Sequence, residues 1–545
     1  MERDVEKDAA LGRQPEESSA GVLEPMRSSE NARSTEETLM ERSDLAKEGQ
    51  RGLRNDPEAN VGDGSEDSAS PQGDHKFEVG WDGGDADPLC PRSFSKARKW
   101  LIVIIVSSCG FCVTAASSIY TTTYAQMEAE FGNSRIVSVL GLSTFVMGIA
   151  VGPMLLSPLS EFYGRRPIYL VSFLLYIIWM IPQAVAHNIA TVVVTRFFPG
   201  AAGSAFLAVA GGTVGDLFAR EELQAPMSIF TIAPFLAPAI GPMLGGFISY
   251  HVSWRWVHYV MIIWGAALYA CLVILVPETY HPILIRKKAQ SRRKETGDER
   301  YHAPNERIDR SVVSAILTSL KRPFQLLFFE YMVLSLCLYS AILLGTLYLF
   351  FGAFPLVFGT NHGFNLWQVG LSFMGICVGM MVTLVLDPVW HHIRGNLTRK
   401  LEEETGVEGA SEPEFRLPPA ILGSLLVPIG IFMFGWTSYS SIHWIVPIIG
   451  SAIFGAGTIL IFTGVLTFLV DAYPTYAASA IAANAFVRCA FAAAFPLFGN
   501  QMYNRLGYPW ASSLLAFLTL AMLPFPYLFF KYGKSIRARS SYATS

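Results

Sequence analysis

Charge is scarce over most of this sequence. Only 16% of the 545 residues are charged and 51% are hydrophobic, which is far from the composition of an ordinary soluble protein. The charge is also unevenly placed, because 23 of the 44 acidic residues precede position 91. The remainder is too apolar for a soluble domain, so the composition predicts a polytopic membrane protein.

Several motifs that carry chemistry are also absent. No Gly-x-x-x-x-Gly-Lys-Ser/Thr stretch occurs, so ATP is not expected to power the protein directly. His391-His392 is the one adjacent histidine pair, and no second histidine cluster follows at the spacing of a metal site. Cys109 and Cys112 lie in an apolar run, where packing explains them better than metal or redox chemistry. With no catalytic serine or cysteine constellation either, we expect no enzyme activity, no metal and no cofactor.

The first 94 residues lack long apolar segments. Such a stretch, rich in Ser, Glu, Gly and Asp, cannot bury enough apolar surface to offset its ordering entropy. It has no apolar core of a signal peptide. We therefore expect residues 1–94 to be a disordered, acidic cytoplasmic tail, with a partner-binding tail as the alternative.

The rest of the chain contains twelve long apolar runs. About 20 apolar residues are needed for a helix to cross the hydrocarbon core. The sequence therefore predicts an all-α membrane protein with twelve transmembrane helices, at about 101–122, 136–156, 167–186, 190–213, 226–249, 257–276, 329–352, 366–386, 418–437, 444–470, 478–499 and 510–530.

Basic residues gather on one side of these spans. Eleven Lys or Arg lie in the loop 281–323, and others directly precede the first span and follow the last, whereas the opposite loops hold only Arg135, Arg255 and Arg505. The positive-inside rule then places both termini and this loop in the cytoplasm. The predicted organisation is an N-terminal half, a cytoplasmic linker, a C-terminal half and a second cytoplasmic tail, at 95–276, 277–325, 326–531 and 532–545.

A short internal repeat supports two related halves. "MGIAVG" at 147–152 and "MGICVG" at 374–379 each lie in the second span of a half. Two six-span halves related by an axis along the membrane normal form a transporter architecture, with the substrate site between them near mid-membrane. The repeat therefore favours a transporter.

The cytoplasmic turn between spans two and three, "SPLSEFYGRRP" at 157–167, is unusually charged. Gly164 permits a sharp turn, and Arg165 and Arg166 would lie where anionic lipid attracts them. Glu161 can pair with these arginines or cap a neighbouring helix N-terminus. A simple positive-inside anchor would explain the arginines but not the acid and the glycine at this spacing.

Together with stretches elsewhere, this turn resembles the major facilitator superfamily. Within that family the chain is similar to the fungal drug:proton antiporter branch with twelve spans, through "RFFPGAAGS" at 196–204, "APAIGPMLGGF" at 237–247 and "VPETYHPILIRKKA" at 276–289. The resemblance covers roughly residues 95–535 and implies the major facilitator fold. It implies that Glu161, Gly164, Arg165 and Arg166 form a conformational latch, although Ser157 stands where the family has glycine. It also implies an antiporter motif that contains Gly241, Pro242, Gly245 and Gly246.

Charged residues inside the predicted spans are few: Arg196, Glu330 and Arg488. A charge at the middle of a membrane helix costs roughly 2.5–3.5 kcal/mol on insertion scales, so Arg488 should face a cavity or a partner. Asn484 is one turn before it on the same face. We expect these arginines, Asn484, Tyr120, Tyr339 and Tyr348 to line the substrate cavity or to take part in coupling, and backbone carbonyls around Arg488 are the alternative.

The sign of these charges favours a neutral or anionic substrate. The proton carrier stays open, with Glu330, Asp216 and Asp471 as unranked candidates. The resemblance implies a proton-coupled exporter of small amphipathic molecules such as drugs, toxins or an endogenous secondary metabolite. It would be a monomer in the plasma membrane, without a nucleic-acid partner. The alternatives are an uptake permease or facilitator for a nutrient, a receptor that does not transport, and a vacuolar or other internal membrane.

Overall fold

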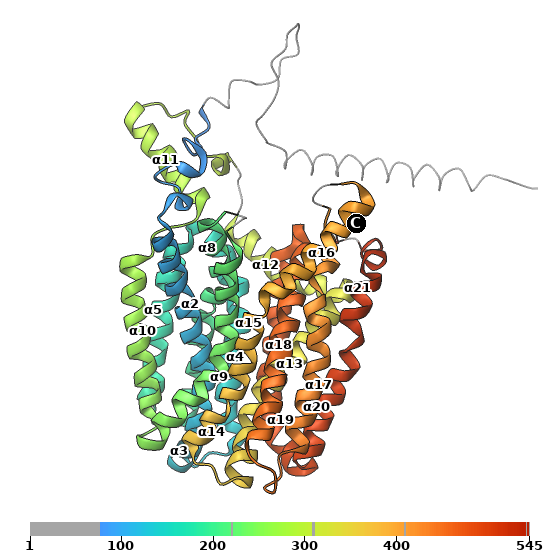
Figure 1. Ribbon diagram of the computed structural model, residues 1–545. Coiled ribbons are helices and arrows are strands. Elements are labelled where there is room, and N and C mark those ends of the chain that lie inside the picture. Colours follow the sequence, from blue (N-terminus) through green and yellow to red (C-terminus); the bar gives the residue numbers. More distant parts are fainter. Residues whose placement is uncertain (1–76, 220–221, 308–310, 408–409, 541, 544–545) are drawn as a thin grey trace, which may run out of the picture. The chain divides into compact units, whose positions relative to one another are not determined.

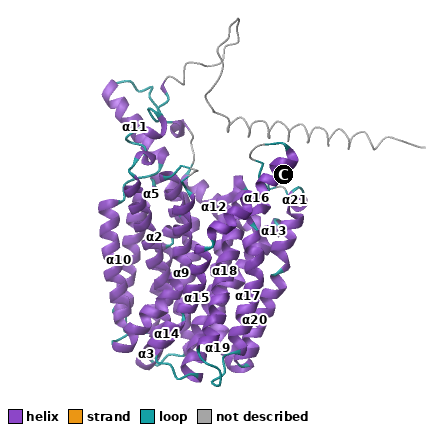
Figure 2. Cartoon of the chain, in the orientation of Figure 1, coloured by secondary structure: helices purple, strands orange, loops and turns teal. Residues whose placement is uncertain are grey.

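The computed structural model describes residues 77–219, 222–307, 311–407, 410–540 and 542–543. By its internal contacts the chain divides after Gln72, and every described residue belongs to the unit Gly73–Ser545. This unit is helical (Figure 2). In its described residues, extended chain pairs only in an isolated bridge between Glu78 and His302.

The first six spans form one bundle of long helices (Figure 1). Two of them, the first and the fourth, change helix type or break along their length. In chain order the elements are α2 Lys96–Ile119 with the 3₁₀ turn η4 Tyr120–Thr123 and α3 Tyr124–Phe131, α4 Arg135–Tyr163, α5 Arg165–Ala184, the broken span α6 Ile189–Gly203, α7 Ala205–Ala208 and α8 Ala210–Leu217, α9 Gln224–His251 and α10 Arg255–Leu275.

The second six spans repeat this arrangement. They are α13 Tyr331–Phe354 with the π-helix Pro355–Asn361, α14 Leu366–Ser372 with α15 Met374–Val385, α17 Pro418–Trp436, α18 Ile445–Ala472, α19 Ala477–Leu506, and α20 Tyr508–Met522 with α21 Pro524–Arg537. Three further helices lie between spans: α11 His281–Thr296, α12 Val312–Phe329 and α16 Asp387–Thr405. The end of the bundle that carries α11 and α16 is called the linker end, and the opposite end the far end (Figure 1). Short 3₁₀ turns complete the list: η2 Gly84–Ala86, η3 Pro91–Ser93, η5 Pro304–Arg307, η7 Pro413–Arg416 and η8 Pro474–Tyr476.

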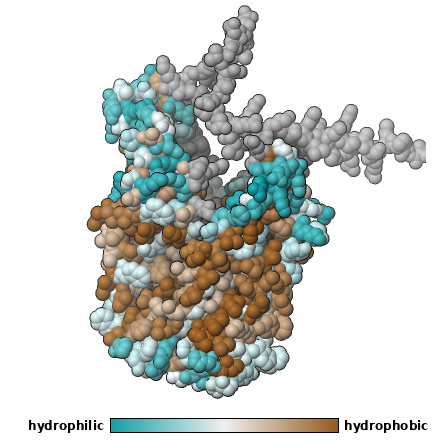
Figure 3. Space-filling view, in the orientation of Figure 1, coloured by the Kyte–Doolittle hydropathy of each residue, from teal (hydrophilic) through white to brown (hydrophobic). Residues whose placement is uncertain are grey.

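Hydrophobic side chains form a band around the helices, and hydrophilic ones gather at both ends (Figure 3). Thirteen helices in the described part of the chain are long and apolar enough to cross a membrane. Twelve of them correspond to the predicted spans. The protein is therefore a multi-pass helical membrane protein.

The thirteenth candidate is α12, which the sequence placed in the linker and its border with the seventh span. Glu330 follows α12 directly, and its carboxylate accepts hydrogen bonds from Ser540 Oγ (2.7 Å) and Tyr473 OH (3.1 Å) at the linker end. Because the chain enters α12 from the linker and leaves it at the same end, α12 does not cross. It packs against α4 of the first half and α19 of the second.

The internal repeat has a structural counterpart in glycine packing. A Cβ at Gly152 of α4 would collide with the backbone oxygen of Ala201 in α6, and one at the corresponding Gly379 of α15 would collide with that of Ala452 in α18. In each half the repeated hexapeptide thus brings the second span against the fourth. Small residues permit this close approach of helices in a membrane.

Residues 77–94 correct one expectation. They belong to the stretch 1–94 that the composition predicted to be disordered, but they contain η2 and η3 and pack on the linker. Val79 is buried against Ala289 of α11 and Ala303. Residues 1–76 lie outside the described chain. The acidic composition led to a wrong prediction of disorder for residues 77–94, because their carboxylates are neutralised by basic residues about 200 positions later in the chain.

Lys288 of α11 is the centre of this neutralisation. Its Nζ atom lies 2.5 Å from Asp87 Oδ2 and 2.9 Å from Asp82 Oδ2, and Arg292 contacts Asp82 as well. The hydrogen bond from Lys288 lowers the pKa of Asp87. A lowered carboxylate pKa means that the pair stabilises the docked segment at neutral pH and loses this effect as the pH falls through the lowered pKa.

Removal of the docked segment should expose the linker. We expect deletion of residues 2–92 to speed tryptic cleavage within 286–294 several-fold, because α11 loses its partners Val79, Asp82 and Asp87. Deletion of residues 2–72, which removes no described contact, is the control and should leave cleavage unchanged. Limited proteolysis of the purified proteins measures both rates, and equal rates in the two deletions would contradict the docking.

Candidate functional site

Arg196 is fully buried and is held by the backbone. Its Nε donates to Gly141 O of α4 (2.8 Å), and its Nη2 donates to Ala116 O (3.0 Å) and lies 3.4 Å from Ser117 O, both of α2. The guanidinium also covers the ring of Tyr120, 3.8 Å from its centroid. Because α6 carries this arginine, one side chain joins three spans of the first half.

Arg488 of α19 has a different environment. It is half-buried, and its guanidinium lies over two rings that contact each other, Phe235 in α9 (5.0 Å) and Phe462 in α18 (5.2 Å). Its Nε and Nη1 atoms are out of contact with solvent and have no hydrogen-bond partner among the described residues. Asn484, one turn away and completely buried, leaves both atoms of its amide unpaired in the same part of the structure. Backbone carbonyls were the alternative partners expected for Arg488. The structure places such carbonyls around Arg196, whereas Nε and Nη1 of Arg488 have none among the described residues.

The three tyrosines occupy three different places. Tyr120 OH donates to Ser138 O (3.1 Å), so this residue belongs with Arg196. Tyr348 OH lies 2.9 Å from Ser117 Oγ and so links α13 to α2 across the two halves. Tyr339 is fully buried and lies beside Ser424 of α17, within the second half. It is two positions from Cys337, which neighbours Arg488 and Asn484, so it points to the other side of α13.

The charged turn between α4 and α5 is organised by an acid that the sequence analysis did not single out. Glu278, three residues after α10, accepts hydrogen bonds from the backbone N–H groups of Arg165 (2.9 Å) and Arg166 (3.2 Å). It thereby caps the N-terminus of α5, where a negative charge is favourable. Gly164 has φ 94°, and a Cβ there would collide with this carboxylate. The position of Glu278 just after the sixth span, on the same side as the turn, was the available signal.

Side chains of the turn make further contacts. Arg165 Nε lies 3.4 Å from Asp216 Oδ2 at the end of α8, and Arg165 Nη1 donates to Ser160 Oγ (2.7 Å). Arg166 Nη2 donates to Val273 O (3.0 Å) of α10. Glu161 is exposed and has no hydrogen bond or ion pair with any described residue. In this conformation Asp216 and Glu278 hold the arginines, and a role for Glu161 stays a prediction about another conformation.

The second half carries a related pair at the linker end. Arg416, two residues before α17, binds Asp471 near the end of α18 (2.7 Å). This repeats the position of Arg165 at the start of α5 and Asp216 at the end of α8. Glu414 forms a two-pronged, almost fully buried pair with Arg537 (2.8 and 2.9 Å). The two halves thus share an arrangement in which the third and fourth spans are tied by charge.

The glycine-rich segment of α9 contacts two neighbours. A Cβ at Gly241 or Gly245 would collide with Ser118 or Thr122 of the first span, which agrees with the close approach expected from the small-residue spacing. Gly246 and Pro242 instead face the other half. A Cβ at Gly246 would lie 2.9 Å from Leu366 O, and one at Gly370 would lie 2.5 Å from Pro242 O. The predicted motif therefore lies where α9 meets α14 near the far end.

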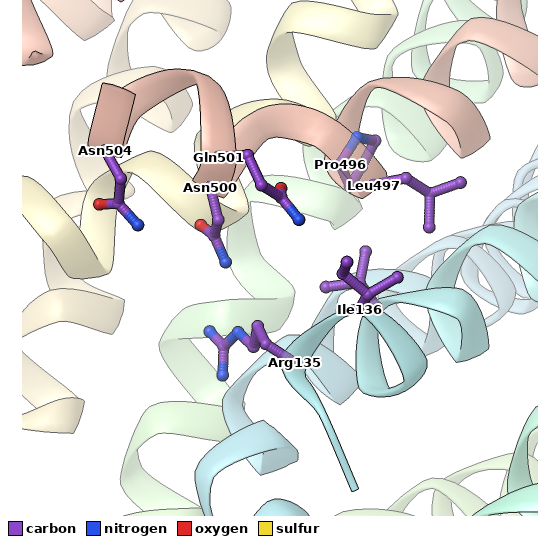
Figure 4. A pocket seen from close by; sticks show the side chains of 8 residues that line it. Arg135, Ile136, Pro496, Leu497, Asn500, Gln501 and Asn504 are labelled. Atoms are coloured by element: carbon purple, nitrogen blue, oxygen red, sulfur yellow. The ribbon is translucent and has the colours of Figure 1, made fainter. Parts of the chain in front are cut away.

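Other contacts close the far end. Ser143 of α4 donates to Ala493 O of α19 (2.6 Å), and Phe247 stacks on Trp367. A pocket of about 210 Å³ lies outside this contact, between the start of α4 and the end of α19. Arg135 and Ile136 face Asn500 and Gln501 across it (Figure 4). Its first α19 residue, Pro496, follows Arg488 by two turns, or about 12 Å of helix rise.

Comparisons with known proteins agree with this architecture. The family model described as Major Facilitator Superfamily matches residues 106–496. "Efflux pump atB" of Aspergillus terreus is 54% identical over 476 residues, which cover 87% of this chain and 92% of that protein. "Probable drug/proton antiporter YHK8" of Saccharomyces cerevisiae is 41% identical and covers 86% and 91%. A solved structure of the xylose transporter XylE from E. coli, in a partially occluded inward-open conformation, shares the fold, with a TM-score of 0.54, 14% identity and coverage of 80% and 99%.

The capping role of Glu278 can be tested against Glu161. Glu278→Gln weakens charge-assisted hydrogen bonds worth about 1.5–3 kcal/mol, so we expect a lower thermal midpoint and reduced transport at equal surface level. Glu161→Gln should leave the thermal midpoint unchanged, because it has no partner here, yet shift the balance between conformations by about 1–3 kcal/mol if it pairs in another state. Unchanged transport in Glu161→Gln would remove Glu161 from the latch, and an unchanged midpoint in Glu278→Gln would contradict the cap.

The contact between α9 and α14 can be tested with one methyl group. Gly370→Ala forces a Cβ onto Pro242 O, and such overpacking costs typically about 1–3 kcal/mol. We expect the far end to open more often, so that a cysteine introduced as Asn500→Cys reacts faster with a membrane-impermeant maleimide. Gly395→Ala in α16, where a Cβ would meet nothing within 4 Å, is the control. Equal labelling rates in both variants would exclude a sealing role for Gly370.

Proposed function

Because this chain belongs to the major facilitator superfamily, and within it to the fungal drug:proton antiporter branch, we propose that it is a proton-coupled exporter of small amphipathic organic molecules. The relatives named above as an efflux pump and a drug/proton antiporter support this reading over most of their length. A multidrug transporter of Aspergillus fumigatus that is 41% identical supports it as well. Drugs, toxins or an endogenous secondary metabolite are the substrate class that these names suggest.

The single observation that carries the mechanism is that Arg488 and Asn484, at the junction of the halves, have polar atoms without hydrogen-bond partners among the described residues. Transporters of this architecture bind substrate between their halves and rock the halves around the site. Contacts between α9 and α14 and between α4 and α19 seal the far end in the described conformation. In our proposal they separate during each cycle, and the pocket of Figure 4 then lies on the release route.

The positive-inside rule supports a cytoplasmic linker end, so that the far end would face outward. Basic residues are concentrated in α11 and at the ends of the first and last spans. We place the protein as a monomer in the plasma membrane, with an internal membrane such as the vacuolar one as the alternative. On this orientation the substrate enters from the cytoplasm and leaves at the far end.

Glu330 is our candidate for the proton carrier. Its carboxylate is nearly buried and accepts hydrogen bonds from two hydroxyl groups, those of Tyr473 and Ser540. Asp216 and Asp471, the other candidates, each bind an arginine. Protonation of Glu330 breaks none of the described ion pairs, whereas protonation of either aspartate breaks one. Glu330 also lies directly between α12 and the seventh span, where a change in its charge can move both.

Two other functions differ from this proposal in measurable ways. An uptake permease is one of them, and the shared fold with the D-xylose–proton symporter does not favour it, because at 16% identity that likeness concerns the fold alone. It would carry substrate in the opposite direction. A receptor that does not transport would bind ligand without flux.

Transport in inside-out plasma-membrane vesicles tests the proposal. With the linker end outside and the vesicle interior made acidic, we expect accumulation of a fluorescent drug substrate that collapses when a protonophore is added. Glu330→Gln should bind the substrate but lose the dependence on the proton gradient. Asp387→Asn is the control for loss of a carboxylate. Asp387 lies in α16, and its described contact is His391.

Each alternative has its own outcome in this assay. Accumulation only in right-side-out vesicles with an acidic exterior would establish uptake and refute export. Binding without accumulation in either orientation would favour a receptor. Full proton dependence in Glu330→Gln would remove Glu330 from the coupling step but leave export intact.

A further inference from the structure

Four polar atoms without partners lie close together on one face of α19. They are Nε and Nη1 of Arg488 and the amide oxygen and nitrogen of Asn484. A buried donor or acceptor left unpaired costs about 1–3 kcal/mol, and more when it is charged. Native structures hold few such groups, and each requires an explanation. Four of them within one helical turn indicate a site that is completed by something outside the described chain.

A buried arginine in this fold does not have to lack hydrogen-bond partners. Arg196, also within the bundle, finds carbonyl partners on two neighbouring spans, at 2.8 Å for Gly141 and 3.0 Å for Ala116. Arg488 instead has aromatic rings near its guanidinium and no oxygen within reach of its Nε and Nη1 atoms among the described residues. The contrast between the two arginines separates a structural role from a binding role.

The counter-charge of Arg488 is not supplied by the neighbouring side chains. Its neighbours on α9, α18 and α13 include Phe235, Phe462, Cys337 and Tyr348, and none of the groups that influence its charge is a carboxylate. Cys489 adjoins it on α19.

Glu330, Asp216 and Asp471, the carboxylates considered as proton carriers, are engaged elsewhere. Glu330 accepts from Tyr473 and Ser540 at the linker end. Asp216 and Asp471 bind Arg165 and Arg416. An anion that neutralises Arg488 therefore has to come from a ligand.

We propose that Arg488 and Asn484 form the anchoring site for the carboxylate of an aromatic or similarly flat organic acid. The inference deepens the proposed export function by naming the substrate class. A guanidinium presents planar N–H donors that match the two oxygens of a carboxylate, and charge-assisted hydrogen bonds of this kind are short and strong. The Asn484 amide adds one donor for the carboxylate and one acceptor for a hydroxyl group of the same ligand.

The surrounding rings specify the rest of the ligand. Phe235 comes from the first half and Phe462 from the second, and their centroids are 4.7 Å apart. A flat apolar body attached to the carboxylate would pack on both rings at once. The ligand would then touch both halves of the bundle, so that its binding and the relative position of the halves depend on each other. A cationic ligand would instead meet the like charge of Arg488.

Binding to the purified full-length protein in nanodiscs tests the site without any proton gradient. The probes are 2-naphthoate, its neutral analogue 2-naphthamide and the cation 2-naphthylmethylamine, each titrated against the thermal midpoint at pH 7. We expect wild type to bind 2-naphthoate at least about tenfold more tightly than 2-naphthamide, because the guanidinium fork pairs with the carboxylate alone. The cation should not bind measurably.

The variants separate the charge from its geometry. Arg488→Gln should abolish the preference for 2-naphthoate, and Arg488→Lys, which keeps the charge but loses the planar fork, should reduce it several-fold. Asn484→Leu should weaken binding of both naphthoate and naphthamide. Arg505→Gln removes an exposed arginine from the same helix and should change nothing. A single symmetric peak in size-exclusion chromatography confirms that each variant folds.

Three results would overturn the site: no binding of 2-naphthoate to wild type, equal affinity for acid and amide, or a preference that survives in Arg488→Gln. These failures are distinguishable from a failure of the export proposal. Carboxylate binding with no vesicle transport would refute export and keep the site. Export of a neutral or cationic substrate that persists in Arg488→Gln would refute the site and keep export.

Discussion

A hydrocarbon environment offers no hydrogen bonds, so a polar group in this bundle, and above all a charged one, is costly unless the chain, water or a ligand satisfies it. That constraint explains why the two membrane arginines differ. Arg196 is satisfied internally, by carbonyls of α2 and α4, and in return it fixes these spans to α6. Arg488 is left incomplete at a point where both halves contribute a ring. The bonded arrangement of Arg196 stabilises one half as a rigid unit. The unpaired arrangement of Arg488 suits a site whose partner is a ligand that binds and leaves during function.

The same constraint places most ion pairs at the ends of the helices, where water and headgroups lower their cost. Arg165 with Asp216 and Arg416 with Asp471 occupy corresponding positions in the two halves, as do the glycines that bring the second span onto the fourth. The pairs lie at the linker end, whereas contacts between α9 and α14 lie at the far end. Ion pairs therefore connect spans within a half, and glycine packing closes the contact between α9 and α14 of opposite halves. Rocking of the halves can break this glycine contact without disturbing the ion pairs.

The sequence was sufficient for features that depend on local composition. The twelve spans follow from apolar runs, the family from motifs that the comparisons support, and the glycine approach of α9 from small-residue spacing. Features that depend on distant partners could not be predicted. The acidic stretch near Asp87 looked disordered because its partner Lys288 lies 201 positions away. Glu278 was missed as the cap of α5 for the same reason, since its position after the sixth span indicates the side of the bundle but not which helix end on that side it caps. Tyr339 and Tyr348 are both polar aromatics of α13, and only packing distinguishes the one beside Ser424 from the one that contacts Ser117 across the halves.

An anion held at Arg488 would also affect the energetics of the transport cycle. A ligand shifts an equilibrium between conformations only by the difference between its affinities for them. Phe235 and Phe462 lie on opposite halves, so the apolar part of the site changes when the halves move, while Arg488 and Asn484 stay together on α19. Export of a monovalent anion in exchange for one proton moves two positive charges inward per cycle, and each is worth about 2.3 kcal/mol per 100 mV of membrane potential. The positive sign of this site would therefore let the potential and the proton gradient drive export in the same direction, an advantage that a site of negative charge for cations would not have.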